Sequence, residues 1–422
     1  MRFKIKELLA LLIFVLPGIS MGQSGVSLTL DDCIRIGLEQ NQTLRINRFE
    51  TDRSVSQAKS NVAIILPVVN FSLSGGSADN FGTGWNGSYG TSLTLNQNIW
   101  DGGVWLNTLK SAKVAEHAAD IQYQSYEINT IFQIKSAYYN YLSTQQLLDV
   151  YKENMTTSNY QHQLTLERFK LGAASQNDTL RTRVNIEKSR LQIINGEVDL
   201  QSKARTLNII LGRDWDSPLS LAEPAWEAVN IPNGTSVVED VVNSNPQLQL
   251  LEQNKAISNY NMKIARAGYM PSLGFSASYR NSADEMGNVF EGSTSSKYSG
   301  VSMTWNLFNG TRTSRSVEQG KINAKLAVEN YDLSERNLRK ELAQTLEQMN
   351  ALQESEEISR LILSASEQDL LLAQEQYKIG SLSILDVLRI TASYEDAKSN
   401  LIRTQHNLKI AEAGLLQLMG KR

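Results

Sequence analysis

The sequence predicts a mainly α-helical chain with long antiparallel coiled-coil helices, four β-strands and an internal two-fold repeat. Three observations lead to this fold class. Two stretches of about 67 residues contain no proline and almost no glycine, which predicts long helices. Each half of the chain also holds two segments in which apolar and polar residues alternate, as in a half-buried strand. Finally, one sequence motif occurs twice, 208 residues apart.

The repeat divides the chain. The segment ERFKLGAASQNDTLRTR (167–183) matches EQYKIGSLSILDVLRIT (375–391), so that Gly172 and Gly380 are equivalent. We interpret 23–212 as the first repeat and 236–422 as the second. Residues 213–235 hold three of the seven prolines and are expected to form a connector.

The helical patterns are expected at 104–170 and 311–378. In the first, apolar residues recur every seven positions, from Ile134 through Tyr141 to Leu148, which predicts coiled-coil packing. At 1.5 Å per residue such a helix is roughly 100 Å long. A bundle of shorter helices is the alternative, but no Gly, Pro or Asn cluster marks the turns that it needs. Shorter helices are expected on either side of the long ones, and two of them end to end would match one long helix: about 44–65, 177–211, 247–269 and 385–419.

The strands are expected at about 67–75, 90–100, 271–280 and 298–308. Val69, Phe71 and Leu73 alternate with small polar residues, and the other strands behave alike. A soluble sandwich usually exposes charged residues on its polar face, whereas this face is neutral. Strands of about ten residues with one apolar and one polar face are typical of an outer-membrane barrel. The glycine-rich segment 75–84 is expected to be an external loop and no phosphate-binding loop.

Composition excludes several classes of protein. With 41 basic and 44 acidic residues, the net charge is −3, which argues against nucleic acid as a partner. One cysteine and three histidines leave no basis for a disulfide framework, a metal site or a catalytic triad, and we expect no cofactor and no enzyme activity. Cys33 is expected to be a buried thiol. Residues 1–22 have a basic start and a short apolar run, which predicts a secretory signal peptide.

Four strands are too few to close a membrane barrel, and open strand edges are excluded in lipid. Several copies of the chain must therefore share one barrel, with cyclic symmetry as the usual solution. Two copies would supply eight strands and three would supply twelve. Polar residues on the inward face favour the wider barrel with three copies.

Over nearly its whole length after the signal peptide, the chain resembles the TolC-like outer membrane efflux proteins. The resemblance is carried by short motifs in a fixed order and by their duplication. These motifs are Leu66-Pro67 and Met270-Pro271 before strands, Trp100-Asp101-Gly102 and Phe308-Asn309-Gly310 after strands, the Gly-x-x-Ser-x-x-Asp-x-Leu turns at Gly172 and Gly380, and Asn245-Pro246-x-Leu248 before a short helix.

The resemblance implies a homotrimer in the outer membrane of a Gram-negative bacterium. Its parts would be a twelve-stranded β-barrel in contact with outer membrane lipid and a helical α-barrel that crosses the periplasm, with residues 213–235 as an equatorial connector. The implied function is the exit duct of a tripartite efflux pump or type I secretion system. The implied partners are a periplasmic adaptor protein and an inner-membrane pump or ABC transporter.

The repeated turns are the candidate site. Gly172 and Gly380 permit the turn, and Ser175 and Ser383 can cap the helices that follow. Asp178 and Asp386 occupy the first helical turn, where a carboxylate suits the helix dipole. Helix capping alone also explains this pattern.

The resemblance places these turns at the periplasmic tip. It implies that Gly172, Ser175, Gly380 and Ser383 lie where the adaptor docks and that Asp178 and Asp386 line a gate. Arg389 stands where the best-known members carry a second aspartate, and Arg181 is its repeat counterpart. An Asp and an Arg three residues apart can neutralise each other, which argues against a strong cation-binding ring. Tyr377 matches a tyrosine that holds the tip closed, whereas Leu382 replaces the family's nearby arginine.

The function that the sequence favours is passive conduction of cargo that a pump supplies. A structural periplasmic coiled-coil or adaptor protein is the first alternative, although it leaves the four strands unexplained. A secreted enzyme is the second, and no pattern of residues supports it. Neither the cargo nor the class of pump can be deduced from the residues.

Overall fold

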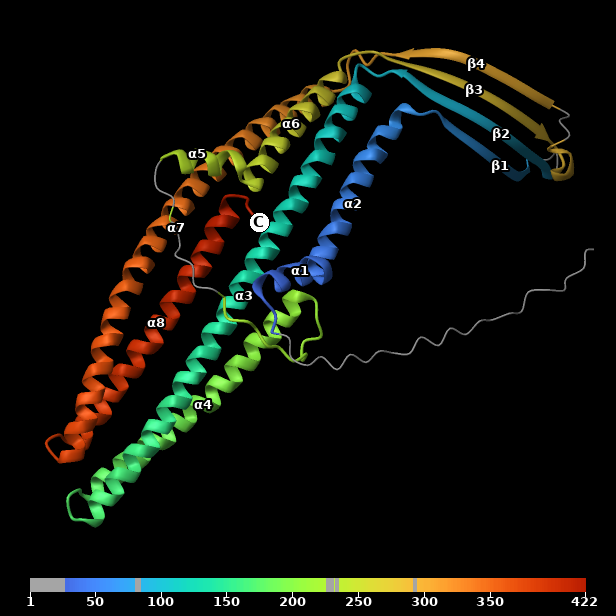
Figure 1. Ribbon diagram of the computed structural model, residues 1–422. Coiled ribbons are helices and arrows are strands. Elements are labelled where there is room, and N and C mark those ends of the chain that lie inside the picture. Colours follow the sequence, from blue (N-terminus) through green and yellow to red (C-terminus); the bar gives the residue numbers. More distant parts are fainter. Residues whose placement is uncertain (1–26, 80–84, 225–230, 232–234, 291–293) are drawn as a thin grey trace, which may run out of the picture.

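A computed structural model describes residues 27–79, 85–224, 231, 235–290 and 294–422 (Figure 1). The predicted signal peptide, residues 1–22, lies outside this part. In chain order, the described elements are α1 (Leu30–Gln40), α2 (Gln42–Val62), the short 3-10 helix η1 (Ala63–Ile65), β1 (Val68–Asp79), β2 (Trp85–Trp100), α3 (Val104–Lys170), α4 (Gln176–Leu211), α5 (Thr235–Ser244), α6 (Pro246–Ala267), β3 (Ser272–Ala283), η2 (Met286–Asn288), β4 (Thr294–Thr304), α7 (Arg312–Ile379) and α8 (Ile384–Leu418).

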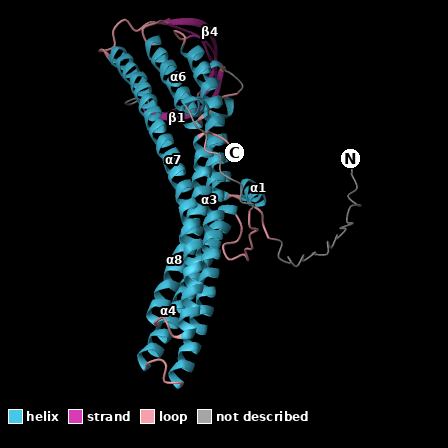
Figure 2. Ribbon diagram, turned by 60° about the vertical axis from the view of Figure 1, so that its left-hand side comes forward, coloured by secondary structure: helices cyan, strands magenta, loops and turns pink. Residues whose placement is uncertain are grey.

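The two long helices are confirmed as single helices. α3 has 67 residues and α7 has 68, so each is about 100 Å long at the usual rise. α2 and α4 pack against α3, and α6 and α8 pack against α7. Each pair of short helices follows one long helix from end to end, as the lengths predicted (Figure 1). Both views place the turns after α3 and α7 at the end of the helices opposite the sheet (Figures 1 and 2).

An asparagine makes the same joint between short helices in both repeats. Asn41 precedes α2, and its Oδ1 accepts a hydrogen bond from the Leu44 amide at 2.7 Å. Its Nδ2 donates to the carbonyl of Ile210 at the end of α4, at 2.6 Å. Asn245 does the same for α6, donating to the Leu418 carbonyl at the end of α8 at 2.9 Å. One side chain thus caps the start of one helix and the end of the other, which satisfies main-chain groups that helix ends leave free.

The four strands form one antiparallel sheet in the order β1-β2-β3-β4. Strand pairing places Phe71 opposite Leu93, Leu93 opposite Tyr279, and Phe275 opposite Val301. Directly paired residues share a face, so the apolar positions of all four strands form one continuous surface. The halves of the chain join at β2 and β3, and β1 and β4 remain as the two edges.

The structure corrects three sequence-based expectations. Helices α1 and α5 were not predicted. The first part of the expected glycine-rich loop belongs to β1, which runs to Asp79. The last strand ends at Thr304 rather than near residue 308, because the chain leaves the sheet where the Trp305 indole donates to the Tyr269 carbonyl at 3.1 Å.

Two apolar clusters lie beside the helix joints. One packs Ile134, Tyr138 and Leu142 of α3 against Cys33, Leu207 and Leu211, and it confirms that Cys33 is a buried, free thiol. The other packs Val241 of α5 against Leu342 of α7 and Leu415 of α8. Leu221 of the connector and the small helices α1 and α5 are therefore fixed to the middle of the long helices by burial of apolar area.

The described helices include none that is both long enough and apolar enough to span a lipid bilayer.

Candidate functional site

The two repeated turns are built alike at the tip. Gly172 and Gly380 have φ of 72° and 85°, a left-handed conformation that favours glycine at the end of a helix. Ser175 caps α4 by accepting a hydrogen bond from the Asp178 amide at 3.1 Å. Ser383 caps α8 by accepting from the Asp386 amide at 3.3 Å. The predicted glycine and serine positions thus come together in two equivalent turns.

The aspartates of the two turns have different partners. Asp178 accepts hydrogen bonds from the Ser175 main chain at 3.0 Å and from its hydroxyl at 2.8 Å. These bonds, helped by the charge of Arg181, lower the pKa of Asp178. Asp386 accepts from the Ser383 hydroxyl at 2.7 Å and pairs with Arg389 at 3.2 Å. The described ion pairs include none between Arg181 and Asp178. The Asp386 carboxylate is thus paired with an arginine, whereas the Asp178 carboxylate is held by hydrogen bonds from Ser175.

Near the tip, Tyr377 connects the helical hairpin of α3 and α4 to the helical hairpin of α7 and α8. The Tyr377 side chain is 5% exposed and packs with Ile384 and Val387 against Leu164 of α3. Its hydroxyl lies 2.9 Å from the Thr165 hydroxyl, also on α3. Leu382, which stands in place of an expected arginine, belongs to the same apolar cluster.

The sequence analysis missed Arg168, which supplies a cation from the other repeat. The Arg168 guanidinium lies 4.7 Å from the centre of the Tyr377 ring, within the range of a cation–π interaction. It also donates to the Tyr377 carbonyl, one of the main-chain acceptors that the end of α7 leaves free. A difference between the two repeats could have indicated this contact. Arg168 and Phe169 of the first repeat are equivalent to Gln376 and Tyr377 of the second. The first repeat therefore supplies the arginine and the second supplies the tyrosine.

Above the tip, α3, α4 and α8 meet through polar side chains, which we call the polar seam. Gln161 donates to the Thr391 hydroxyl at 2.9 Å, and both residues are buried. Further contacts of the polar seam include Ser158 to Ser189 at 3.3 Å, His162 to Thr182 at 2.8 Å, Asn154 to Glu395 at 2.6 Å and Gln192 to Glu395 at 3.0 Å. Neutral hydrogen bonds contribute little net stability, about 1 kcal/mol each. The polar seam therefore contributes less stability per contact than the apolar clusters in the middle of the helices.

Glu395 is the carboxylate of the polar seam. It is half-buried, and its carboxylate accepts from amides on two other helices, Asn154 on α3 and Gln192 on α4. Desolvation raises the pKa of Glu395, and these two hydrogen bonds only partly oppose it. The Asn154 Oδ1 atom is buried and has no partner, so a protonated Glu395 could donate to it if the amide turned over.

We expect Glu395→Gln to raise the thermal midpoint at neutral pH and to remove part of its pH dependence. Folding raises the pKa of Glu395, so the folded state binds more protons than the unfolded state between the two pKa values. The free energy of unfolding is therefore highest below the pKa of the unfolded state, and it falls as the pH rises through the pKa of the folded state. Circular dichroism melts at pH 5 and pH 7.5 measure this dependence. Equal pH dependence in the wild type and in Glu395→Gln would contradict the prediction.

The described residues contain no group of His, Cys, Asp and Glu placed to hold a metal ion. His406 is buried, and burial lowers its pKa to about 4. Its Nε2 lies 3.0 Å from Gln146 Oε1 and its ring 6.2 Å from that of Tyr139. We interpret it as a packing residue between α3 and α8.

Comparison with known proteins agrees with this architecture. The family model described as outer membrane efflux protein matches residues 34–213 and 237–421. The probable efflux pump outer membrane protein TtgC of Pseudomonas putida is 23% identical over 93% of this chain and 82% of its own. The outer membrane efflux protein BepC of Brucella suis is 22% identical over 99% of this chain and 90% of its own.

Solved structures show the same fold. CusC superposes with a TM-score of 0.85 at 19% identity, covering 96% of both chains. The CmeC outer membrane channel of Campylobacter jejuni gives a TM-score of 0.83 at 17% identity, over 93% of this chain and 85% of its own. The family model covers both repeats and leaves out most of the connector. We conclude that the chain belongs to the outer membrane efflux protein family, whose members are outer-membrane channels.

Proposed function

We propose that three copies of this chain assemble into the exit duct of a tripartite efflux pump. The observation that carries the proposal is that one chain is an open arc. Helix contacts run from α4 through α3 and α8 to α7 in the tip half, and from α2 through α3 and α6 to α7 in the sheet half. The arc thus begins at α2 and α4 and ends at α7, and cyclic assembly closes it.

Both ends of the arc carry exposed apolar side chains at helical spacing. On α4 each is 50% to 65% exposed, and we call them the α4 stripe: Leu180, Val184, Leu191, Ile194 and Val198. On α7 each is 49% to 67% exposed, and they form the α7 stripe: Ile322, Leu326, Leu333, Ile358, Leu361, Ile362 and Leu372. At 100° per residue, each set falls on one face of its helix. Exposed apolar stripes of this length indicate an interface.

The two stripes also lie at matching distances along their helices from the turns at the tip. Leu180 lies eight residues after Gly172, and Leu372 lies eight residues before Gly380. Leu191 and Leu361 are likewise each 19 residues from their turn glycine. Since both turns lie at the same end of the molecule, the α4 stripe of one copy would meet the tip half of the α7 stripe of the next.

The sheet supports the same assembly. β1 and β4 are edges within one chain, and unpaired edges are excluded in lipid. Pairing β4 of one copy with β1 of the next would give a twelve-stranded barrel. Its apolar face, with Val69, Phe71 and Val301 exposed, would contact outer membrane lipid.

The tip would be the gate and the docking place for the other components of the pump. We propose that a periplasmic adaptor engages the turns at Gly172, Ser175, Gly380 and Ser383, and that an inner-membrane pump or ABC transporter supplies the cargo. Asp178, Asp386, Arg181, Arg389 and Tyr377 would form the gate, together with Arg168. Relatives are named for the efflux of different cargoes: antibiotics, toluene and cations. The duct itself would need no catalytic activity, and the two repeats, 23–212 and 236–422, would each supply half of its wall.

The purified protein in detergent tests the proposal. We expect a trimeric mass by light scattering, migration that changes on heating, and discrete conductance steps in planar bilayers. A soluble monomer that needs no detergent would overturn the proposal and favour the periplasmic adaptor alternative.

Replacing Asp178 and Asp386 together with Ala is expected to change single-channel conductance or its block by divalent cations. Three copies would bring six carboxylates to one constriction, and such rings set ion preference. The matched control is Glu375→Ala, which removes an exposed carboxylate on α7 paired with Lys378. Unchanged conductance and block in the double variant would remove these residues from the gate.

A further inference from the structure

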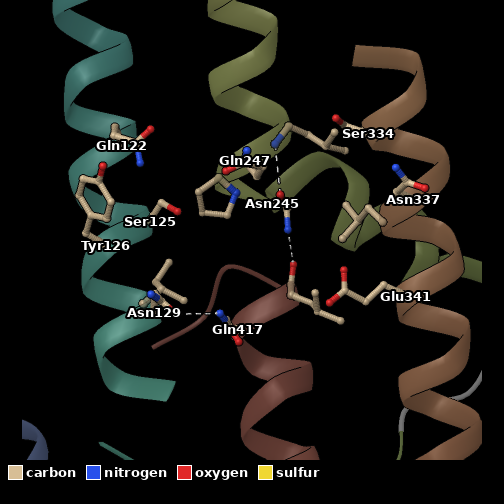
Figure 3. A pocket seen from close by; sticks show the side chains of 15 residues that line it. Gln122, Ser125, Tyr126, Asn129, Asn245, Gln247, Ser334, Asn337, Glu341 and Gln417 are labelled. Atoms are coloured by element: carbon tan, nitrogen blue, oxygen red, sulfur yellow. Dashed lines mark hydrogen bonds between the residues drawn. The ribbon is translucent and has the colours of Figure 1, made fainter. Parts of the chain in front are cut away.

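A polar pocket opens at the joint of the second repeat. It has a volume of about 480 Å³ and lies between α3, α6, α7 and the end of α8 (Figure 3). That volume falls within the range of small-molecule sites. The pocket lies outside the tip site described above.

Internal hydrogen bonds build the frame of this pocket. Asn245 joins the start of α6 to the end of α8, as described above. Gln417 of α8 donates to Asn129 Oδ1 of α3 at 3.2 Å, and both bonds appear in Figure 3. Leu248 and Leu338 line the pocket and also belong to the apolar cluster with α5. The opening is therefore shaped by the helix joint itself.

Other polar side chains of the lining remain unengaged. They come from three helices, and none of these side chains makes a hydrogen bond with another described group: Gln122, Ser125 and Tyr126 of α3, Gln247 of α6, and Ser334 and Asn337 of α7. Ser125 on one wall and Glu341 on the other extend into the pocket (Figure 3). These groups are free to bind a ligand without breaking an existing contact.

Apart from Glu341, the polar side chains of the lining are uncharged amides and hydroxyls that can both donate and accept hydrogen bonds. An amide side chain offers donors and an acceptor, and a hydroxyl offers both on one atom. Glu341 is the one charged residue in the lining, and no basic residue lines the pocket. Anionic ligands such as phosphates therefore find no cation. A largely apolar drug would leave the polar groups without partners, which costs free energy.

We propose that this pocket binds a saccharide without anionic groups. A sugar ring presents adjacent hydroxyls that both donate and accept, which matches amides and hydroxyls on opposite walls. The Glu341 carboxylate can accept from two neighbouring hydroxyls, and the Tyr126 ring offers an apolar face. The inference rests on the fold and the pocket, and it goes beyond conduction through the duct.

Calorimetric titration of the purified protein with N,N′-diacetylchitobiose tests the proposal. The detergent must carry no sugar headgroup, because dodecyl maltoside would compete for the pocket. We expect saturable binding, and weaker binding of glucose 6-phosphate than of glucose. The double variant Gln122→Ala, Asn337→Ala removes one amide from each wall, and should bind about thirtyfold more weakly, as expected for two lost neutral hydrogen bonds.

Gln348→Ala is the matched control, because Gln348 is an exposed amide on α7 outside the pocket. It should bind like the wild type, and all variants should melt like the wild type, since neither Gln122 nor Asn337 has an internal partner. Binding of the disaccharide would identify free saccharides as ligands. Sedimentation with insoluble chitin, an uncharged polymer of the same sugar, without disaccharide binding, would identify a glycan polymer instead.

Absence of saturable binding to both probes, or equal affinity in the double variant, would overturn the proposal. Neither readout uses conductance, so failure of the proposed duct function and failure of this inference are distinguishable.

Discussion

Replacing Leu191 by glutamate is expected to prevent assembly of the proposed trimer. Leu191 lies in the middle of the α4 stripe, is 58% exposed in one chain, and would be covered by the α7 stripe of the next copy. A carboxylate buried there without a partner costs several kcal/mol, on the order of the penalties for unpaired buried charge. Cyclic symmetry would place this cost in every interface. Light scattering of the detergent-solubilised protein should show monomers, and conductance should disappear.

Leu191→Met is the control, because methionine keeps the apolar character and nearly the volume of leucine. Circular dichroism at low temperature should show that Leu191→Glu keeps its helices, since this side chain makes no part of the core of one chain. A stable trimer of Leu191→Glu would contradict the proposed contact between the α4 stripe and the α7 stripe.

Replacing Arg168 by alanine is expected to open the tip. The change removes a hydrogen bond to the Tyr377 carbonyl and a cation–π contact with the Tyr377 ring. A hydrogen bond to a charged group contributes roughly 1.5 to 3 kcal/mol, and a cation–π contact contributes roughly 0.5 to 2 kcal/mol. Because Arg168 belongs to one hairpin and Tyr377 to the other, their separation would widen the entrance. Single-channel recordings should show larger conductance or a higher open probability.

Gln376→Ala is the matched control, because Gln376 occupies the equivalent position of the second repeat and its exposed side chain has no described partner. Tyr377→Phe should have a smaller effect, since it loses only the bond to Thr165. Conductance of Arg168→Ala equal to that of the wild type would exclude this contact from the gate.

Most of the fold was predictable from local patterns. A helical pattern without proline and with almost no glycine has nothing to interrupt it, which predicted α3 and α7. Alternation of apolar and polar residues is typical of a strand with two different faces, which predicted the four strands. Helices α1 and α5 were missed because they are short and their stability comes from packing against α3 and α7. The fourth strand was predicted too long, since the alternation of Trp305 and Leu307 continues beyond the point where Trp305 binds a main-chain carbonyl.

The candidate site was predictable only in part. Capping residues act within four positions of each other, and their types alone indicate them: Gly172, Ser175 and Asp178 in one turn, and their repeat counterparts in the other. Arg168 and Tyr377 are 209 residues apart in sequence, and no local pattern connects them. The polar seam was missed for the same reason, because its serines, threonines and amides look like surface residues until three helices enclose them.

The sequence by itself determined the duplication, the long helices and the faces of the strands, because each depends on the spacing of residues along one segment. Only the tertiary structure decided which helix borders which, that each repeat contributes a different half of the contact between Arg168 and Tyr377, and that Glu395 is desolvated. These properties depend on the packing of segments from opposite halves of the chain. Periodicity shows which face of a helix is apolar, and only the fold shows what covers it.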